Sequence, residues 1–179
     1  MNIFYLNTDP KEAAKLHCDK HVVKMVIEYA QLMSTAHRVL DGTQYLDKTA
    51  NGRNIKRWRL DNNNEEGVIY KASHINHPSG IWTRQSTQHY MFVYALFKAL
   101  CKEYTHRYGR KHLTEIKLDS IICNPPKNMT DKGFTQPPQA MPDDVKTESS
   151  VDAYQAYYKK YKVDFAKWTN RQTPQFMYD

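Results

Sequence analysis

The stretch AAKLHCDKHVVKMVIEYAQLMSTAHRVLDG (residues 13–42) has the apolar spacing of a long helix with a narrow polar stripe. Residues 9–12 (Asp-Pro-Lys-Glu) form a helix-start signal, with an Asp that can cap, Pro at the first helical position and a Glu that can reach back as in a capping box. The Asp-Gly pair at 41–42 is a stop signal. The pattern therefore predicts one helix from about residue 10 to about Leu40.

The polar side chains of this predicted helix gather on one side. At about 100° per residue they fall within an arc of roughly 100°. They are His17, Lys20, His21, Lys24, Glu28, Gln31, Thr35 and Arg38. Most other positions are apolar, so the stripe either faces solvent through a gap or lines a cleft. In the first interpretation, Lys24 and Glu28 are an ordinary surface pair at i,i+4 spacing.

In the second interpretation, the stripe supplies catalytic groups. His17 and His21 carry imidazoles, which as a class titrate near neutral pH. The proximity of Lys20 and Lys24 favours an anion site or a nucleophilic amine. Glu28 is the one carboxylate of the stripe, which suits a general acid or base. The flanking lysines disfavour a zinc pair at the two histidines, so we expect neither a metal nor another cofactor.

Two further helices are predicted downstream. A Pro-Ser-Gly turn precedes a long apolar-periodic run that ends at a glycine, which predicts a helix over Ile81–Tyr108. A Ser-Ser pair at 149–150 then caps a final helix over about Val151–Thr169.

Three other segments read as extended or irregular. Residues 2–6 are a short apolar run, residues 41–76 are a polar surface excursion with space for a short helix, and residues 124–144 carry five prolines in 21 positions. Such a proline content predicts a surface strap. The expected fold is mainly α: a single compact helical domain (1–179) with three principal helices, a short N-terminal extended segment and a proline-rich strap.

The composition favours a polyanionic partner. The chain has 26 Lys+Arg against 19 Asp+Glu and a net charge of +7, which suits nucleic acid or a phosphorylated substrate. The three cysteines (Cys18, Cys101 and Cys123) are odd in number and lack CxxC spacing, so a reducing cytoplasm is expected. No apolar run reaches the ~18 residues of a membrane span. We expect a soluble cytoplasmic protein, and the oligomeric state stays open.

Several residues outside the stripe are candidates for binding phosphate or nucleic acid. The start of the second helix would offer free N–H groups to an anion, and the last helix interleaves aromatic rings with lysines, as nucleic-acid surfaces do. The candidates are His77, Arg84, Arg107, Tyr157, Lys160 and Arg171, together with His17. For each, the competing interpretation is an incidental loop residue or a core position.

Several segments together resemble a family of small uncharacterised proteins encoded by tailed bacteriophages. They are MNIFYL, AAKLHCDKHVVKM, NHPSGIW, CKEYTHRYGRKH, QAMPDD, YQAYYKKYK and FAKW. The resemblance covers nearly the whole chain, with residues 41–72 the least familiar. It implies that the protein works in the cytoplasm of an infected host cell.

A looser similarity is to the small helical pyrimidine-dimer DNA glycosylases of phages. That family uses an N-terminal amine nucleophile, a catalytic glutamate on the first long helix and a C-terminal aromatic-basic segment that touches DNA. Glu28 and YYKKYK (157–162) occupy comparable places here. The chain departs from the pattern at its start, because Asn2 hinders removal of Met1. The nucleophile would then be the Met1 amine or a lysine.

The leading hypothesis is therefore an enzyme that acts on a base flipped out of double-stranded DNA, a glycosylase or lyase of pyrimidine-dimer type. An amine of Lys20, Lys24 or Met1 would attack C1′ of the sugar, and Glu28 would manage protons. His21 or His77 would hold phosphate.

Two alternatives remain. One is a phage transferase that hypermodifies DNA by displacing an activating phosphate from a hydroxymethylated pyrimidine, with His17, Lys20, His21, Lys24 and Arg84 binding the leaving group. The other is a non-enzymatic basic protein that binds nucleic acid or a host protein, in which the stripe is solvated.

Overall fold

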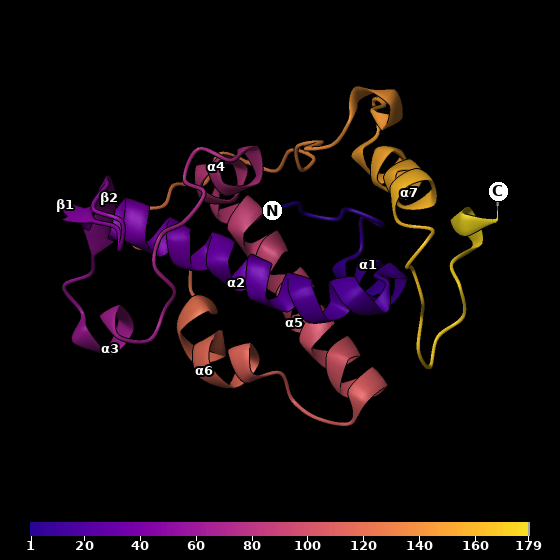
Figure 1. Cartoon of the computed structure of the whole chain (residues 1–179), viewed down its shortest axis with the longest axis horizontal. Coiled ribbons are helices and arrows are strands. Elements are labelled where there is room, and N and C mark those ends of the chain that lie inside the picture. Colours follow the sequence, from indigo (N-terminus) through magenta and orange to yellow (C-terminus); the bar gives the residue numbers. More distant parts are fainter. Residues whose placement is uncertain (179) are drawn as a thin grey trace.

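The computed structural model describes residues 1–178 and, at position 63, the backbone alone. The fold is mainly α, as expected (Figure 1). The helices are α1 (Pro10–Leu16), α2 (Asp19–Asp41), α3 (Asn63–Glu66), α4 (Pro78–Gln85), α5 (Thr87–Tyr108), α6 (Leu113–Ile122) and α7 (Ser150–Tyr161). Strands β1 (Thr43–Lys48) and β2 (Asn54–Arg59) pair as an antiparallel hairpin, and two 3₁₀ turns lie at Asp143–Val145 and Gln175–Met177.

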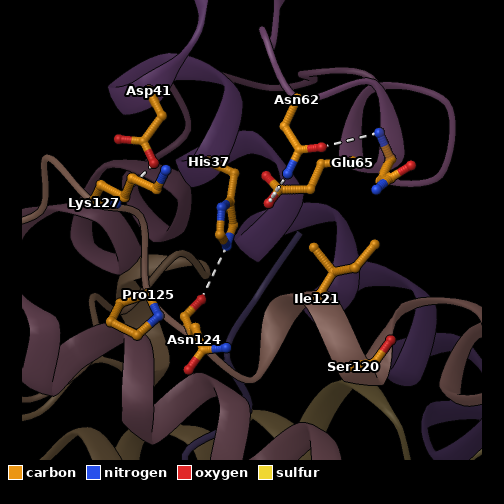
Figure 2. A pocket seen from close by; sticks show the side chains of 10 residues that line it. His37, Asp41, Asn62, Glu65, Ser120, Ile121, Asn124, Pro125 and Lys127 are labelled. Carbon is orange, nitrogen blue, oxygen red and sulfur yellow. Dashed lines mark hydrogen bonds between the residues drawn. The ribbon is translucent and has the colours of Figure 1, made fainter.

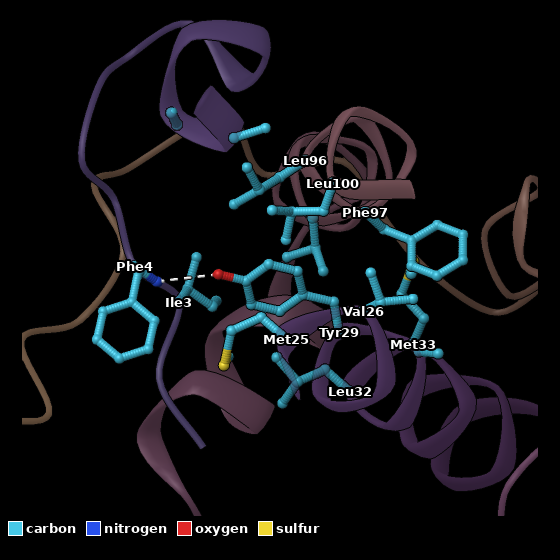
Figure 3. Packing of buried hydrophobic residues seen from close by; sticks show 14 of the residues in the cluster. Ile3, Phe4, Met25, Val26, Tyr29, Leu32, Met33, Leu96, Phe97 and Leu100 are labelled. Atoms are coloured by element: carbon cyan, nitrogen blue, oxygen red, sulfur yellow. Dashed lines mark hydrogen bonds between the residues drawn. The ribbon is translucent and has the colours of Figure 1, made fainter. Parts of the chain in front are cut away.

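The core forms around α2, where it packs against α5. Figure 3 shows the ring of Tyr29, from α2, between Leu96 and Leu100 of α5 and the N-terminal segment. Tyr29 is fully buried, and its hydroxyl accepts a hydrogen bond from the backbone N–H of Phe4 at 3.1 Å. Each large apolar side chain buried in this way contributes about 1.5–3 kcal/mol. The expected N-terminal extended segment is therefore part of the core.

The helix predicted over residues 10–40 is two helices. His17 and Cys18 have extended backbone between α1 and α2, and distant residues satisfy the polar groups that the break frees. The N–H of Asp19 donates to Lys167 O at 2.8 Å, and Trp168 Nε1 donates to Leu16 O at 3.0 Å. The prediction of one continuous helix was wrong because these partners arrive about 150 positions later in the chain.

The helix predicted over Ile81–Tyr108 also divides, at Ser86, into α4 and α5. Residues of the proline-rich strap hold the break: Thr87 N donates to Thr130 O at 3.1 Å, and Lys132 N donates to Ser86 Oγ at 3.0 Å. The strap has no helix or strand before the 3₁₀ turn at residue 143, and it contains a turn at residues 127–128.

Two other boundaries differ from the prediction. The last helix ends at Tyr161 instead of Thr169, since residues 162–169 cross the α1–α2 break. Helix α6 was not expected; it begins after His112, whose Nδ1 accepts from Thr114 N at 3.1 Å.

The excursion at residues 41–76 contains the hairpin and α3. Arg38 anchors the end of the hairpin, the end of α3 and the loop that leads from α3 to α4. Arg38 is 3% exposed. Its guanidinium donates to the carbonyls of Trp58, Glu66, Ile69 and Tyr70 and to the Glu66 carboxylate. This end of the predicted polar stripe is therefore sealed by a loop and does not face solvent.

Candidate active site

A polar cavity of about 220 Å³ lies where the N-terminal segment, α2 and α7 meet. It is lined by Met1, Asn2, Phe4, His21, Lys24, Met25, Glu28, Tyr157 and Lys162. We call it the Glu28 cavity. Three of the predicted catalytic residues, His21, Lys24 and Glu28, lie in it together, one helical turn apart on α2.

The carboxylate of Glu28 faces two amines in this cavity. Its Oε1 lies 3.0 Å from Lys24 Nζ, and its Oε2 lies 3.9 Å from the Met1 amine. The Glu28 side chain is 13% exposed, whereas that of Lys24 is 67% exposed. Ser79 at the start of α4 holds the first residue in place, because its Oγ donates to Met1 O at 3.3 Å. A carboxylate is thus placed to exchange protons with either amine.

His21 is on the inner wall of the cavity. Its Nδ1 lies 2.5 Å from Tyr158 OH, and its ring stacks on Phe4 with centroids 4.3 Å apart. Burial lowers the pKa of His21 to about 3, and the nearby charges of His17, Lys162 and Lys24 act in the same direction. A neutral imidazole cannot hold a phosphate by charge, so the expected phosphate-binding role of His21 does not fit.

His17 lies outside the cavity and is completely buried. Its Nδ1 donates to Ala13 O at 2.7 Å, which leaves Nε2, 3.3 Å from Tyr29 OH, as an acceptor. Burial lowers the pKa of His17 to about 4. His17 joins the end of α1 to the core, and no phosphate can reach it.

Lys20 and His77 flank the cavity without lining it. Lys20 is exposed, and its Nζ lies 4.5 Å over the ring of Phe165. His77 caps α4, with Nδ1 accepting from Ser79 N at 3.2 Å. Burial lowers the pKa of His77, and so do the charges of the Met1 amine and His74. His77 is therefore a weak candidate for a cationic phosphate ligand.

Two of the three expected phosphate-binding arginines are paired with carboxylates of the protein itself. Arg107 is 5% exposed; its Nε donates to Glu103 and its NH1 to Asp19, both at 2.8 Å. Arg171 donates twice to Glu103, at 2.9 Å each. We call these four residues the Glu103 cluster. Arg84 NH2 donates to Ile75 O at 2.6 Å, whereas its NH1 is buried without a hydrogen-bond partner among the described residues. Sequence reasoning misread these arginines because it could not see their carboxylate and carbonyl partners.

The last helix contributes one predicted residue and one that was missed. Tyr157 lines the Glu28 cavity, and the Nζ of Lys162 lies 4.5 Å over its ring. Lys162 lay inside the helix predicted to reach Thr169 and was not selected as a candidate. In the structure it follows the end of α7 and closes the YYKKYK segment. Lys160 instead pairs with Asp144 of the strap at 2.5 Å.

A larger cavity, of about 430 Å³, lies at the other end of α2 (Figure 2). His37 forms its inner wall, with Nε2 donating to Asn124 O at 3.1 Å. Burial lowers the pKa of His37, while Glu65 and Asp41 oppose that shift. Asp41 already accepts from the backbone N–H groups of Lys127 and Asn128. These groups mainly fix the strap to α2.

Within residues 1–178, no group of three or more His, Cys, Asp or Glu side chains is arranged to hold a metal ion. No helix in the same range is long and apolar enough to span a membrane. Comparisons of the chain with protein families, with curated proteins and with solved structures found no match. The geometry of the site is thus the basis for a functional proposal.

Proposed function

We propose that the protein is a DNA glycosylase or lyase that works through an amine and Glu28. The observation that carries this proposal is a carboxylate in contact with two amines, those of Met1 and Lys24, inside a polar cavity. Amines can lose a proton and become nucleophiles, which a guanidinium cannot do in a protein. The resemblance to phage pyrimidine-dimer glycosylases implies the same role for Glu28.

The reaction would use the groups of the cavity as follows. The unprotonated amine attacks C1′ of the nucleotide, and the glycosidic bond breaks with its electron pair leaving on the base, which takes up a proton. Glu28 accepts the proton that the attacking nitrogen loses. Opening of the C1′–O4′ bond, with protonation of O4′, leaves an imine that water hydrolyses. The neutral His21 and the ring of Tyr157 form the wall against which a flipped base would lie.

The charge around the cavity supports an anionic substrate. Lys24 and Lys162 line it, and Lys20 is exposed one turn away on α2. No acidic side chain other than Glu28 lines the cavity among the residues described. Lysines in such an arrangement attract phosphates and raise the rate of association.

The test is borohydride trapping, which reduces the imine to a stable covalent adduct. The substrates are duplexes that contain ultraviolet-damaged, abasic, uracil or hydroxymethyluracil sites. We expect an adduct with the native chain on at least one of them. In Glu28→Gln the adduct should form at least about 100-fold more slowly, the lower bound for loss of a general acid or base.

Two variants identify the amine. Lys24→Arg keeps the charge and removes the nucleophile, and a Gly-Ser extension before Met1 displaces the α-amine from the cavity. One of the two should abolish the adduct. Lys20→Arg is the matched control, because Lys20 is a lysine of the same helix whose amine lies over Phe165, and it should trap normally.

Two results would contradict the proposal. An adduct that only Lys20→Arg abolishes would place the chemistry outside the Glu28 cavity. Absence of any adduct on every substrate would exclude the amine mechanism and favour a basic nucleic-acid binder. The phosphate-displacing transferase is disfavoured, because its expected cluster does not assemble: His17 is buried and Arg84 is bound to a backbone carbonyl.

A further inference from the structure

The hairpin formed by β1 and β2 projects beyond the end of α2 (Figure 1). Its strands pair in register from Thr43↔Arg59 to Lys48↔Asn54. All six residues of β1 are exposed, and no residue of β2 is fully buried. A two-stranded hairpin is marginally stable by itself in water. Core packing therefore explains little of the sequence of residues 43–59.

The hairpin concentrates the positive charge of the protein. Residues 43–59 contain five basic side chains, Lys48, Arg53, Lys56, Arg57 and Arg59, and one acidic side chain, Asp47. Its net charge of +4 is more than half of the chain's +7. None of the five forms an ion pair with a carboxylate in the part of the chain that the structure describes. Four of them, Lys48, Arg53, Lys56 and Arg59, are exposed and so remain available to a partner, unlike Arg38 and Arg107.

The register distributes the cations over both faces of the ribbon. Because facing residues share a side and successive pairs alternate, Arg57 and Arg59 lie on one face with Tyr45, and Lys48 and Lys56 lie on the other. Arg59 also lies 5.1 Å from the centroid of the Tyr45 ring. A ribbon of this kind can contact phosphates on both sides of a groove.

We propose that the hairpin 43–59 docks duplex DNA, with the ribbon in the major groove. The major groove of B-DNA, about 12 Å wide, admits a two-stranded β-ribbon. Glu28 and Asp41 are thirteen residues apart on α2, a rise of about 20 Å or about six base pairs. The hairpin would thus hold the duplex about half a helical turn from the Glu28 cavity. The choice of partner rests on the proposed function.

The test measures affinity for an undamaged 20-base-pair duplex by fluorescence anisotropy at several salt concentrations. The hairpin variant is Lys48→Gln/Arg53→Gln/Lys56→Gln, three exposed positions. The control variant is Lys102→Gln/Lys111→Gln/Lys117→Gln, which removes the same charge from exposed positions on or beside α5 and α6. Each phosphate contact contributes about 0.9 to the slope of log K against log salt. The hairpin variant should lose about 2.7 of that slope and at least tenfold in affinity at 100 mM salt, whereas the control should lose less than about threefold.

Equal losses in both variants, or unchanged binding in the hairpin variant, would overturn the proposal. It would also be overturned if the hairpin variant lost affinity for an RNA duplex of the same length but not for the DNA duplex. The thermal unfolding midpoint of both variants should match the native chain, since the substituted side chains have no partner in the core. Borohydride trapping separates this proposal from the proposed function. If DNA binding depends on the hairpin but no adduct forms, the amine mechanism alone is excluded. If an adduct forms but DNA binding does not depend on the hairpin, the docking proposal alone is excluded.

Discussion

Glu28 and Glu103 are both carboxylates beside two cationic groups, yet their surroundings differ. Glu103, 3% exposed, accepts three hydrogen bonds from Arg107 and Arg171, and Asp19 completes that cluster. Glu28 has one close partner, Lys24, and a second amine at 3.9 Å. Both carboxylates border a cavity, of about 220 Å³ at Glu28 and about 280 Å³ at Glu103. What differs is the pairing: the Glu103 carboxylate accepts three guanidinium hydrogen bonds, whereas the Glu28 carboxylate has acceptor capacity left for a substrate.

The difference between the two carboxylates separates ion pairs that hold the fold together from ion pairs that can take part in a reaction. The Glu103 cluster uses guanidinium groups, which bind carboxylates in a fixed fork and stay protonated. Hydrogen bonds from Arg171 and Arg107 outweigh desolvation and lower the pKa of Glu103. The Glu28 cavity uses amines, which can give up a proton. A saturated guanidinium pair holds elements together, and an unsaturated amine pair can react.

The largest effect is expected from breaking the closed cluster. Glu103→Ala removes the carboxylate that Arg107 and Arg171 share. It leaves the buried Arg107 with Asp19 as its remaining carboxylate partner. Removal of one partner of a buried pair costs about 3–5 kcal/mol. Chemical denaturation should show this loss in the free energy of unfolding. Lys102→Ala, the exposed neighbour on α5, is the control and should change stability by less than about 0.5 kcal/mol. A loss below about 1 kcal/mol in Glu103→Ala would mean that Glu103, like Glu28, is not a structural carboxylate.

Acid should act next most strongly, through buried histidines, of which His17 and His21 have the lowest pKa values. The pKa of His17 is lowered from the ordinary value of 6.5 to about 4, so at this residue the unfolded chain takes up the proton first. The stabilisation that His17 contributes is complete above pH 6.5 and is lost as the pH falls towards 4, by about 3 kcal/mol in all.

Unfolding midpoints measured between pH 7.5 and 4 test this dependence. His17→Gln should make it shallower, while His21, whose pKa is lowered to about 3, keeps part of it. The exposed His106→Gln should leave it unchanged. An equally steep dependence in His17→Gln would show that another group carries the acid sensitivity.

Arg171→Ala should have a smaller effect than Glu103→Ala. Arg171 is 31% exposed, so in the variant water can replace part of its hydrogen bonding to the Glu103 carboxylate. Arg107 also remains paired with Glu103. We expect a loss of about 1.5–2 kcal/mol, at the low end of the range for hydrogen bonds to charged groups. Thermal or chemical unfolding of the variant measures it, and a loss as large as that of Glu103→Ala would mean that Arg171 alone holds the cluster.

The smallest effect on stability is expected at the open site. Glu28→Gln removes a pair with a largely exposed lysine, and such pairs contribute about 0–1 kcal/mol. Its free energy of unfolding should therefore stay within about 1 kcal/mol of the native value, even though adduct formation is lost. A loss of several kcal/mol would class Glu28 with Glu103 as structural.

Local signals predicted local structure well. The Asp9 cap, the Ser149 cap and the glycine stop at Gly109, with φ of 69°, all occur where the sequence placed them. The helix breaks at His17 and Ser86 were missed, because the groups that satisfy the broken backbone come from the C-terminal segment and the strap. Such partners are invisible to periodicity.

The candidate site divides in the same way. His21, Lys24 and Glu28 could be grouped from the sequence because residues three or four apart share one face of a helix. Met1, Phe4 and Lys162 join them only through the fold. The expected ligands Arg107 and Arg171 are paired for the converse reason, since Glu103 and Asp19, far from them in the sequence or on another turn, supply the two carboxylates.

The sequence by itself determined the helical class, the caps, the charge excess and the grouping of neighbours on one turn of α2, since all of these depend on spacing and composition. The tertiary structure alone decided where helices break, which histidines are buried and neutral, and which cations are already paired. Burial and pairing depend on groups far apart in the chain, and they turn one uniform polar stripe into a buried anchor at His17, an open cavity at Glu28 and a sealed loop at Arg38.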